Sequence, residues 1–330
     1  MEYHSLGKTG LEVSTLGFGS SPFGNVFGNT TLDDNRRAVS AAIDLEINFF
    51  DVSPYYGLTL AEERLGIALA PYRHKILLAT KCGRYGLTEF DFSAKRIKAE
   101  FEKSLSRLKT DYVDLLQAHD IEFAPAEQVI QEALPAMREL QAKGKVRFIG
   151  ITAYPLGLLK RVAEQVPVDT ILSYCRYNLL NTDMEKDLAP FTRERGLGLI
   201  NASPLMMGLL TDAGEPSWHL APPSLKQAGR RAATVAAEHG INISTLALQF
   251  SLAHPSTACT LIGMSSADQV QANVRASERP LELELLKRVK EAIGNGFWTT
   301  WPSGLPENHD GESAEIVYVS HHVYHAFHTN

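Results

Sequence analysis

Residues that can move protons follow apolar runs in the first part of the chain. Asp51, Lys81 and His119 each come directly after an apolar run of the kind that forms a buried strand. Tyr56 follows shortly after Asp51, in a loop that also contains serine, proline and glycine. An acid, a phenol, an amine and an imidazole are therefore all expected at or near strand ends.

These four side chains could act together on one proton. A lysine ammonium beside a phenol favours the phenolate, so Lys81 is expected to lower the pKa of Tyr56, and a nearby Asp51 to keep Lys81 charged. Tyr56 would then be the proton-transfer group near neutral pH, and His119 could hydrogen-bond the reacting oxygen.

Taken singly, each residue has an ordinary structural explanation. Asp51 can end a strand or cap a helix, Tyr56 can be a packed aromatic, and His119 can be a hydrogen-bonded core histidine. Lys81 is harder to explain, because a lysine at the end of an apolar strand needs a counter-ion or water. The combination favours an active site, provided that the fold brings the four residues together.

The rest of the chain alternates between strand and helix patterns. With eight expected strands, this alternation predicts an α/β fold, a (β/α)8 TIM barrel with an N-terminal β-hairpin and extra C-terminal helices. In such a barrel the carboxyl ends of all strands lie on one face, where catalytic groups collect. Continuous helices are expected at 126–143 and 183–195. The expected strands are 14–20, 47–51, 76–81, 112–118, 146–151, 169–174, 197–202 and 258–262.

A doubly wound sheet is the alternative architecture, and the glycines at 17–24 call for a test of the dinucleotide-binding fingerprint. Gly17 and Gly19 supply the first two glycines of G-x-G-x-x-G, but the third position is Pro22. The fingerprint therefore fails, and the barrel is favoured.

Composition narrows the function classes. The 330 residues are 44% hydrophobic, which suits one large core, and the formal net charge of −6 argues against nucleic acid as a partner. The chain has no apolar run long enough for a membrane span and no signal peptide pattern. Cys82, Cys175 and Cys259 are expected to be buried free thiols, which fits a cytoplasmic location. No obligate protein partner is expected.

Two parts are expected, a barrel over residues 1–306 and a polar, poorly ordered tail over 307–330. Four histidines gather in the last ten residues of the tail, a pattern that could form a metal site. A loosely docked extension is favoured instead, and no metal is expected. The histidines are His321, His322, His325 and His328.

On these residues and motifs the chain resembles the aldo-keto reductase superfamily over roughly its first 300 residues. The family's Asp, Tyr, Lys and His tetrad matches the four residues described above, the stretch 7–14 is similar to its opening hairpin, and 264–273 is similar to its adenosine-binding segment. The resemblance implies a nicotinamide cofactor that lies extended across the barrel mouth. The cofactor-binding residues it implies are Thr152, Ser173, Ser203, Leu205, Gly208, Gly263, Ser265, Gln269 and Asn273.

Several stretches, among them 82–85 and 119–123, are similar to the branch of this superfamily that oxidises L-galactose. This implies oxidation of an aldose at C1 to its lactone. Another aldose such as L-fucose, or a generic aldehyde reduction, is the alternative. Asn25, Asp120 and His219 are candidates, by position, for contacts with the sugar hydroxyls.

Three places depart from the family pattern around the nicotinamide. The usual Ser-Asn pair is Thr152-Ala153, the usual Gln is Tyr174, and the aromatic that commonly stacks on the ring is Ala202. The resemblance therefore leaves the nicotinamide contacts open while it keeps the proton-transfer residues.

The cofactor is expected to be NAD in preference to NADP. A 2′-phosphate normally needs an arginine or lysine, and no basic residue occurs from Gly263 to Asp268. The serines there could bind ribose hydroxyls, and Gln269 and Asn273, one helical turn apart, could face the adenine. Arg275 is the nearest cation in sequence, on another helical face.

Two other function classes remain for comparison. A cofactor-binding regulatory subunit without turnover is disfavoured by the complete tetrad. A metal-dependent barrel hydrolase would want an H-x-H pair at a strand end, and residues 1–306 contain none.

Overall fold

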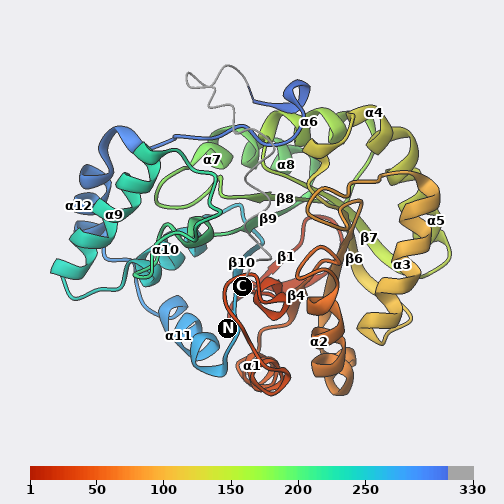
Figure 1. The fold of residues 1–330 in the computed structure, drawn as a ribbon, viewed down its shortest axis with the longest axis horizontal. Coiled ribbons are helices and arrows are strands. Elements are labelled where there is room, and N and C mark those ends of the chain that lie inside the picture. The colour runs from red at the N-terminus through yellow and green to blue at the C-terminus, as the bar shows by residue number, and fades with distance from the viewer. Residues whose placement is uncertain (311–330) are drawn as a thin grey trace.

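The structure is a computed structural model, and it describes residues 1–310. Within these residues eight parallel strands form a closed barrel in chain order, and the last strand pairs with the first. Figure 1 shows the helices arranged around this barrel. The predicted (β/α)8 fold is thus confirmed. The barrel strands are β3 (Leu16–Gly19), β4 (Phe49–Asp51), β5 (Leu77–Cys82), β6 (Val113–Ala118), β7 (Val146–Ala153), β8 (Thr170–Tyr174), β9 (Gly198–Ala202) and β10 (Cys259–Gly263).

The helices alternate with the strands and cover the outside of the barrel (Figure 1). They are α1 (Leu32–Asp44), α2 (Leu60–Leu69), α3 (Ala94–Leu108), α4 (Ala126–Gln128), α5 (Leu134–Ala142), α6 (Leu156–Gln165), α7 (Asp183–Asp187), α8 (Ala189–Arg195), α9 (Pro223–Glu238), α10 (Ile243–Leu252), α11 (Ala267–Ser277) and α12 (Leu283–Ile293). Thr31 and Asp34 form a reciprocal capping box at α1, and Ser266 caps α11. No helix within residues 1–310 is both long and apolar enough to cross a membrane.

Two helices expected to be continuous are interrupted near prolines. The segment 126–143 consists of α4, a π-helical turn over Val129–Ala133, and α5, whose first turn contains Pro135. The segment 183–195 divides into α7 and α8, with Pro190 in the first turn of α8. Proline has no N–H and its ring crowds the preceding turn, so the regular hydrogen-bond ladder does not pass through it.

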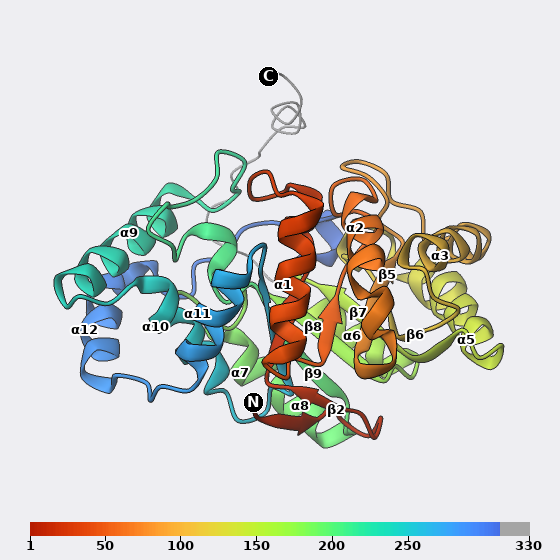
Figure 2. The same cartoon turned by 90° about the horizontal axis from the view of Figure 1, so that it is seen from below.

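The N-terminal hairpin covers the end of the barrel where the strands begin. Its strands, β1 (Tyr3–Ser5) and β2 (Glu12–Ser14), pair antiparallel. Figure 2 shows the hairpin at the lower end of the barrel, away from the loop that leads into α1. Leu6 from the hairpin packs with Phe49 and Leu115 from the strands in one buried apolar cluster. This cluster fills the barrel interior and leaves the opposite end for polar residues.

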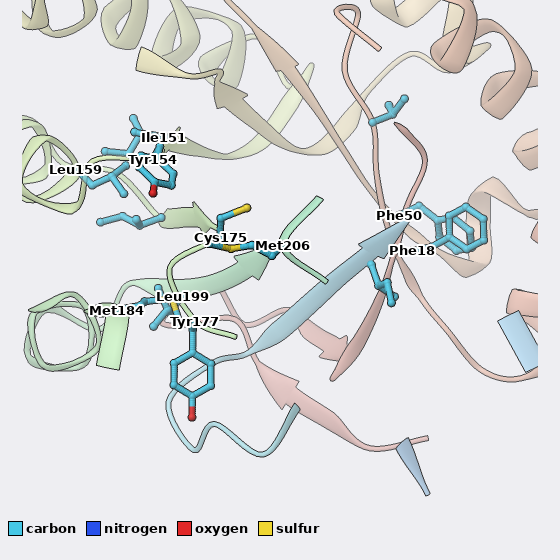
Figure 3. Packing of buried hydrophobic residues seen from close by; sticks show 14 of the residues in the cluster. Phe18, Phe50, Ile151, Tyr154, Leu159, Cys175, Tyr177, Met184, Leu199 and Met206 are labelled. Carbon is cyan, nitrogen blue, oxygen red and sulfur yellow. The ribbon is translucent and has the colours of Figure 1, made fainter. Parts of the chain in front are cut away.

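A larger apolar cluster lies between the strands and the helices, and Figure 3 shows part of it. Phe18 and Phe50, on neighbouring strands, stack with ring centroids 5.0 Å apart. Ile151 and Leu159 belong to the same cluster and join β7 to α6. With apolar packing on both faces, the strands form a rigid frame for the residues at their ends.

The last described residues, 298–310, form a segment here termed the C-terminal strap. The backbone N–H of Leu305 donates to the carbonyl of Glu122 at 2.8 Å. The carboxylate of Asp310 accepts from the N–H of Leu156 at 2.7 Å and from Arg176 at 2.9 Å. The expected boundary at residue 306 thus falls inside a segment whose barrel contacts continue to Asp310. The predicted tail histidines lie outside the described residues.

Candidate active site

Polar residues face inward directly beyond the apolar centre of the barrel. Because side chains alternate between the two faces of a strand, the residue two positions after an inward apolar residue also faces inward. Asp51 follows Phe49 in this way on β4, and Lys81 follows Ala79 on β5. Asp51 pairs with Ala79 in the strand register. Neighbouring strands therefore bring the acid and the amine together at the barrel mouth.

Asp51, Lys81 and Gln117 form a buried network. Nζ of Lys81 donates to Oδ1 of Asp51 and, at 2.9 Å, to the carbonyl of Val52. Nε2 of Gln117 donates to Oδ2 of Asp51 at 2.9 Å. Burial by itself would lower the pKa of Lys81, but Asp51 and Tyr56 outweigh that effect and raise it. The ammonium is therefore charged at neutral pH and held in place.

A close approach between two glycines positions the loop that carries Tyr56. Gly57 has a φ of +62°, and a Cβ there would overlap the carbonyl oxygen of Gly24. A Cβ on Gly24 would in turn lie 2.6 Å from the backbone of Tyr56. The loop after β4 therefore packs backbone to backbone against the turn after β3. This contact holds Tyr56 over Lys81, whose Nζ lies 4.9 Å from the phenol ring centroid.

His119, directly after β6, is a neutral hydrogen-bond donor. Its Nδ1 lies 2.9 Å from Oγ of Ser53, and that oxygen accepts from the N–H of Tyr55 at 3.1 Å. The serine hydroxyl hydrogen is thus directed at Nδ1, and we assign the imidazole proton to Nε2. Burial, reinforced by Lys81, lowers the pKa of His119 to about 3. The ring is uncharged at neutral pH and presents Nε2–H.

The expected low pKa of Tyr56 is wrong. The ammonium of Lys81 does lower it, but burial has the larger effect, and the carboxylates of Asp51 and Asp120 add to the rise. The pKa of Tyr56 is therefore raised to about 12. The sequence shows the lysine but not the loss of solvent around the hydroxyl. At neutral pH Tyr56 is a protonated phenol.

An ion pair beside His119 adds a site residue, Arg84, that the sequence did not single out. Nη1 of Arg84 donates to Oδ2 of Asp120, and the guanidinium carbon lies 3.6 Å from the ring centroid of Tyr55. Asp120 was predicted to contact substrate, and its Oδ2 lies 3.6 Å from Nε2 of His119. The position of Arg84 just after the strand that carries Lys81 could have marked it as a residue of the barrel mouth.

Glu122 is a second buried group that sequence reasoning missed. Its Oε1 accepts from the hydroxyls of Tyr174 at 2.9 Å and Ser303 at 3.1 Å. Burial, together with the charge of Asp120, raises the pKa of Glu122 to about 8. The carboxyl group is therefore mostly protonated at neutral pH. Glu122 thus connects the end of β8 to the C-terminal strap. Its partners are far apart in sequence, so no local sequence pattern could have predicted them.

The other two predicted substrate residues, Asn25 and His219, make hydrogen bonds within loops. Oδ1 of Asn25 accepts from the N–H of Thr30 and from Arg64, both at 3.0 Å. In His219, Nε2 lies 2.9 Å from the carbonyl of Met206, and Nδ1 accepts from a backbone N–H at 3.0 Å. Both ring nitrogens of His219 are thus used, so this residue holds the loop after β9 and has none left for a sugar.

The residues predicted to bind the adenosine half of the cofactor gather at the start of α11. Gly263 ends β10 and is exposed, and a Cβ there would lie 3.0 Å from Pro22. A side chain at this position would therefore press on Pro22 in the turn after β3. Oε1 of Gln269 accepts from Oγ of Ser265 at 2.9 Å, and Asn273 lies one turn further along the helix. These polar, uncharged side chains could bind ribose hydroxyls and an adenine.

The remaining predicted cofactor residues differ in placement. Thr152, at the end of β7, accepts at Oγ1 from the N–H of Asp120 at 2.9 Å, so it lies beside the tetrad. Ser203 and Gly208 have positive φ and, with Leu205, form the turn after β9. Ser173 is a correction, because it alternates with inward Leu172 and Tyr174, and its fully buried side chain lies on the outer face of β8.

Within residues 1–310 the fold and the site together define a class of protein, a single-barrel oxidoreductase in which Asp51, Tyr56, Lys81 and His119 meet at the barrel mouth. The aldo/keto reductase family model matches residues 15–293. The chain belongs to the aldo-keto reductase family, whose members use nicotinamide cofactors. Within residues 1–310 no group of three or more His, Cys, Asp or Glu side chains is placed to hold a metal ion.

Individual relatives agree with this assignment. The chain is 46% identical to L-galactose dehydrogenase of Arabidopsis thaliana, over 93% of this chain and 99% of the relative. It is 28% identical to D-threo-aldose 1-dehydrogenase of a Pseudomonas species, over 86% and 95%. Among solved structures, an aldo-keto reductase of Bacillus halodurans in its holo form matches with a TM-score of 0.73 and 31% identity, over 88% of this chain and 96% of that one.

Proposed function

We propose that this protein oxidises an aldose at C1 to its lactone with NAD, and that L-galactose is a substrate. The observation that carries the proposal is the set of contacts that joins Asp51, Lys81, Tyr56 and His119. Lys81 is pinned by Asp51 and lies under the ring of Tyr56, which meets His119 edge to face. The similarity to two sugar dehydrogenases supports an aldose as the substrate class.

Oxidation removes a hydride from C1 and a proton from the anomeric hydroxyl, and leaves C1 as the lactone carbonyl. Bound nicotinamide supplies the hydride acceptor. Tyr56 takes the hydroxyl proton as its phenolate, which the ammonium of Lys81 stabilises, and Nε2–H of His119 orients the oxygen. Asp51 keeps Lys81 charged throughout. Because the pKa of Tyr56 is raised to about 12, the phenolate is the scarce form at neutral pH.

The proposed preference for NAD has support from charge around α11. Asp268 is exposed in the first turn of this helix and would repel a 2′-phosphate, and the basic residue of its last turn is Arg275, at the far end. On α1, which packs against α11, Arg36 and Arg37 are paired with Asp33 and Asp34. Among the described residues around α11, these contacts leave no arginine or lysine placed to bind the 2′-phosphate of NADP through two parallel hydrogen bonds.

A steady-state screen tests the proposal. L-galactose, L-fucose and other aldoses would each be assayed with NAD and with NADP, and the product would be identified as lactone or acid. We expect L-galactose turnover with NAD and a specificity constant at least roughly tenfold higher than with NADP, as an unpaired phosphate predicts. Reduction of simple aldehydes without sugar oxidation would reject the proposal, and equal constants for both cofactors would reject the NAD preference. Binding of NAD without any turnover would favour a regulatory subunit.

A further inference from the structure

A hydrogen-bond donor and an acceptor lie side by side at the barrel mouth without satisfying each other. Nε2 of His119 lies 3.6 Å from Oδ2 of Asp120, which is longer than an N–H···O bond of about 2.7–3.2 Å. Both side chains are buried, at 4% and 5% exposure. A donor and an acceptor at this spacing could receive two neighbouring oxygens of one ligand.

The carboxylate of Asp120 has acceptor capacity left. Arg84 donates to Oδ2, and Oγ1 of Thr152 lies 3.5 Å from Oδ1, at the outer limit for a hydrogen bond. A carboxylate offers about four acceptor positions. Within residues 1–310 the carboxylate of Asp120 accepts hydrogen bonds from these two side chains. A buried carboxylate with open positions next to the reacting groups is suited to accept from a substrate hydroxyl.

The orientation of Asp120 is fixed from two sides. Its backbone has a φ of 51°, and its N–H donates to Oγ1 of Thr152 at 2.9 Å. Arg84 in turn is enclosed by aromatic rings, with its guanidinium carbon 3.6 Å from the centroid of Tyr55 and 5.2 Å from that of Phe90. The ion pair therefore cannot reorient freely, and the acceptor is positioned before any sugar binds.

The chemistry of the proposed reaction says which hydroxyl Asp120 would meet. Adjacent hydroxyls on a sugar ring hold their oxygens within hydrogen-bonding distance of one another. The 3.6 Å between Nε2 of His119 and Oδ2 of Asp120 lets a sugar that places its C1 oxygen on Nε2 place its C2 hydroxyl on Oδ2. We propose that Asp120, positioned by Arg84, accepts a hydrogen bond from the C2 hydroxyl of the aldose and so determines specificity. This inference rests on the proposed oxidation at C1.

The test compares L-galactose with 2-deoxy-L-galactose in the wild type and in Asp120→Asn. Asparagine tolerates positive φ, so this substitution removes the charge without straining the backbone. The wild type should prefer L-galactose in kcat/KM by about 10- to 100-fold, the range for a hydrogen bond to a charged group. Asp120→Asn should bring the ratio toward one, chiefly through a loss on L-galactose.

Asp114→Asn is the matched control. Asp114 is also a buried carboxylate of the β6 segment, paired with Arg73 and Arg147, but it lies at the opposite end of the strand. This variant should keep the wild-type ratio between the two sugars.

The outcomes separate the inference from the proposed function. Equal wild-type kcat/KM for the two sugars overturns the inference, whether or not the variant folds. So does an Asp120→Asn enzyme that loses activity on both sugars equally, because Asp120 would then act on the catalytic groups and not on the C2 hydroxyl. Failure of the wild type to oxidise any aldose would instead overturn the proposed function, and the inference with it.

Discussion

The rings of Tyr56 and His119 meet edge to face, with centroids 5.6 Å apart and an interplanar angle of 89°. One residue comes from the loop after β4 and the other from the end of β6. A substrate oxygen bound at this contact would meet a phenol and an uncharged imidazole donor together. The proposed chemistry depends on this meeting.

Replacing Tyr56 by phenylalanine should remove proton transfer and leave the site otherwise intact. We expect turnover of L-galactose to fall by at least ~10²-fold, the lower range for general acid–base catalysis. NAD affinity, followed by fluorescence quenching, should change little because the ring over Lys81 is retained. Tyr55→Phe is the control, since it keeps the ring that stacks on Arg84 and should retain most activity. Near-normal turnover in Tyr56→Phe would contradict the assignment.

Sugar oxidation should accelerate as the pH rises. Burial raises the pKa of Tyr56 to about 12, so below that value the phenolate fraction grows about tenfold with each pH unit. Aldehyde reduction, which uses the protonated phenol, should lack this rise. The measurement is kcat in both directions across neutral to alkaline pH. A flat oxidation profile with chemistry rate-limiting would show that Tyr56 is not the base.

Glu122 should make stability depend on pH in a particular direction. An unfolded glutamate releases its proton near pH 4.3, whereas burial raises the pKa of Glu122 to about 8. Between these values the unfolded chain loses a proton that the folded protein keeps, so rising pH destabilises the fold.

Glu122→Gln cannot release that proton, and its amide oxygen can still accept from Tyr174 and Ser303. Relative to the wild type, the variant should gain on the order of 1 kcal/mol of unfolding free energy per pH unit between about pH 5 and 8. Denaturant melts at several pH values measure this gain. Glu62→Gln is the control and is expected to lower the unfolding free energy, because it loses an ion pair with Arg107. If the difference in unfolding free energy between Glu122→Gln and the wild type did not change with pH, the prediction would be contradicted.

The contact between Gly57 and Gly24 should tolerate no side chain. Gly57→Ala combines positive φ with overlap of the Gly24 carbonyl. We expect a loss of at least about 1–2 kcal/mol in unfolding free energy together with lower kcat. Gly10→Ala is the control, since Gly10 has a φ of +72° and a Cβ added there would meet nothing within 4 Å. If both variants behaved alike, the close approach would have no role in placing Tyr56.

The elements of the barrel and the meeting of the tetrad could be predicted because both follow from local patterns. Strand periodicity showed which residues end strands, and the parallel barrel then put those ends on one face. The predictions that were wrong or missing concern residues whose properties depend on partners far away in sequence. The pKa of Tyr56 is set by burial from several strands, and Glu122 is satisfied by β8 and the C-terminal strap.

The errors at Ser173 and His219 have a similar origin. A family position was carried over for Ser173, whereas the alternation on β8 directs its side chain outward. His219 lies in a long irregular connection, which has no helical or strand periodicity from which the direction of a side chain could be predicted. Its hydrogen bonds to the loop backbone are visible only in three dimensions.

The most direct test of the proposed reaction uses L-galactose that carries deuterium at C1. If the hydride leaves C1 while Tyr56 takes the hydroxyl proton, the reduced nicotinamide formed with NAD must carry the deuterium and the lactone must carry none. Mass spectrometry of both products measures this. Deuterium retained in the sugar product, with unlabelled reduced cofactor, would show that oxidation occurs at another carbon and would contradict the proposed reaction.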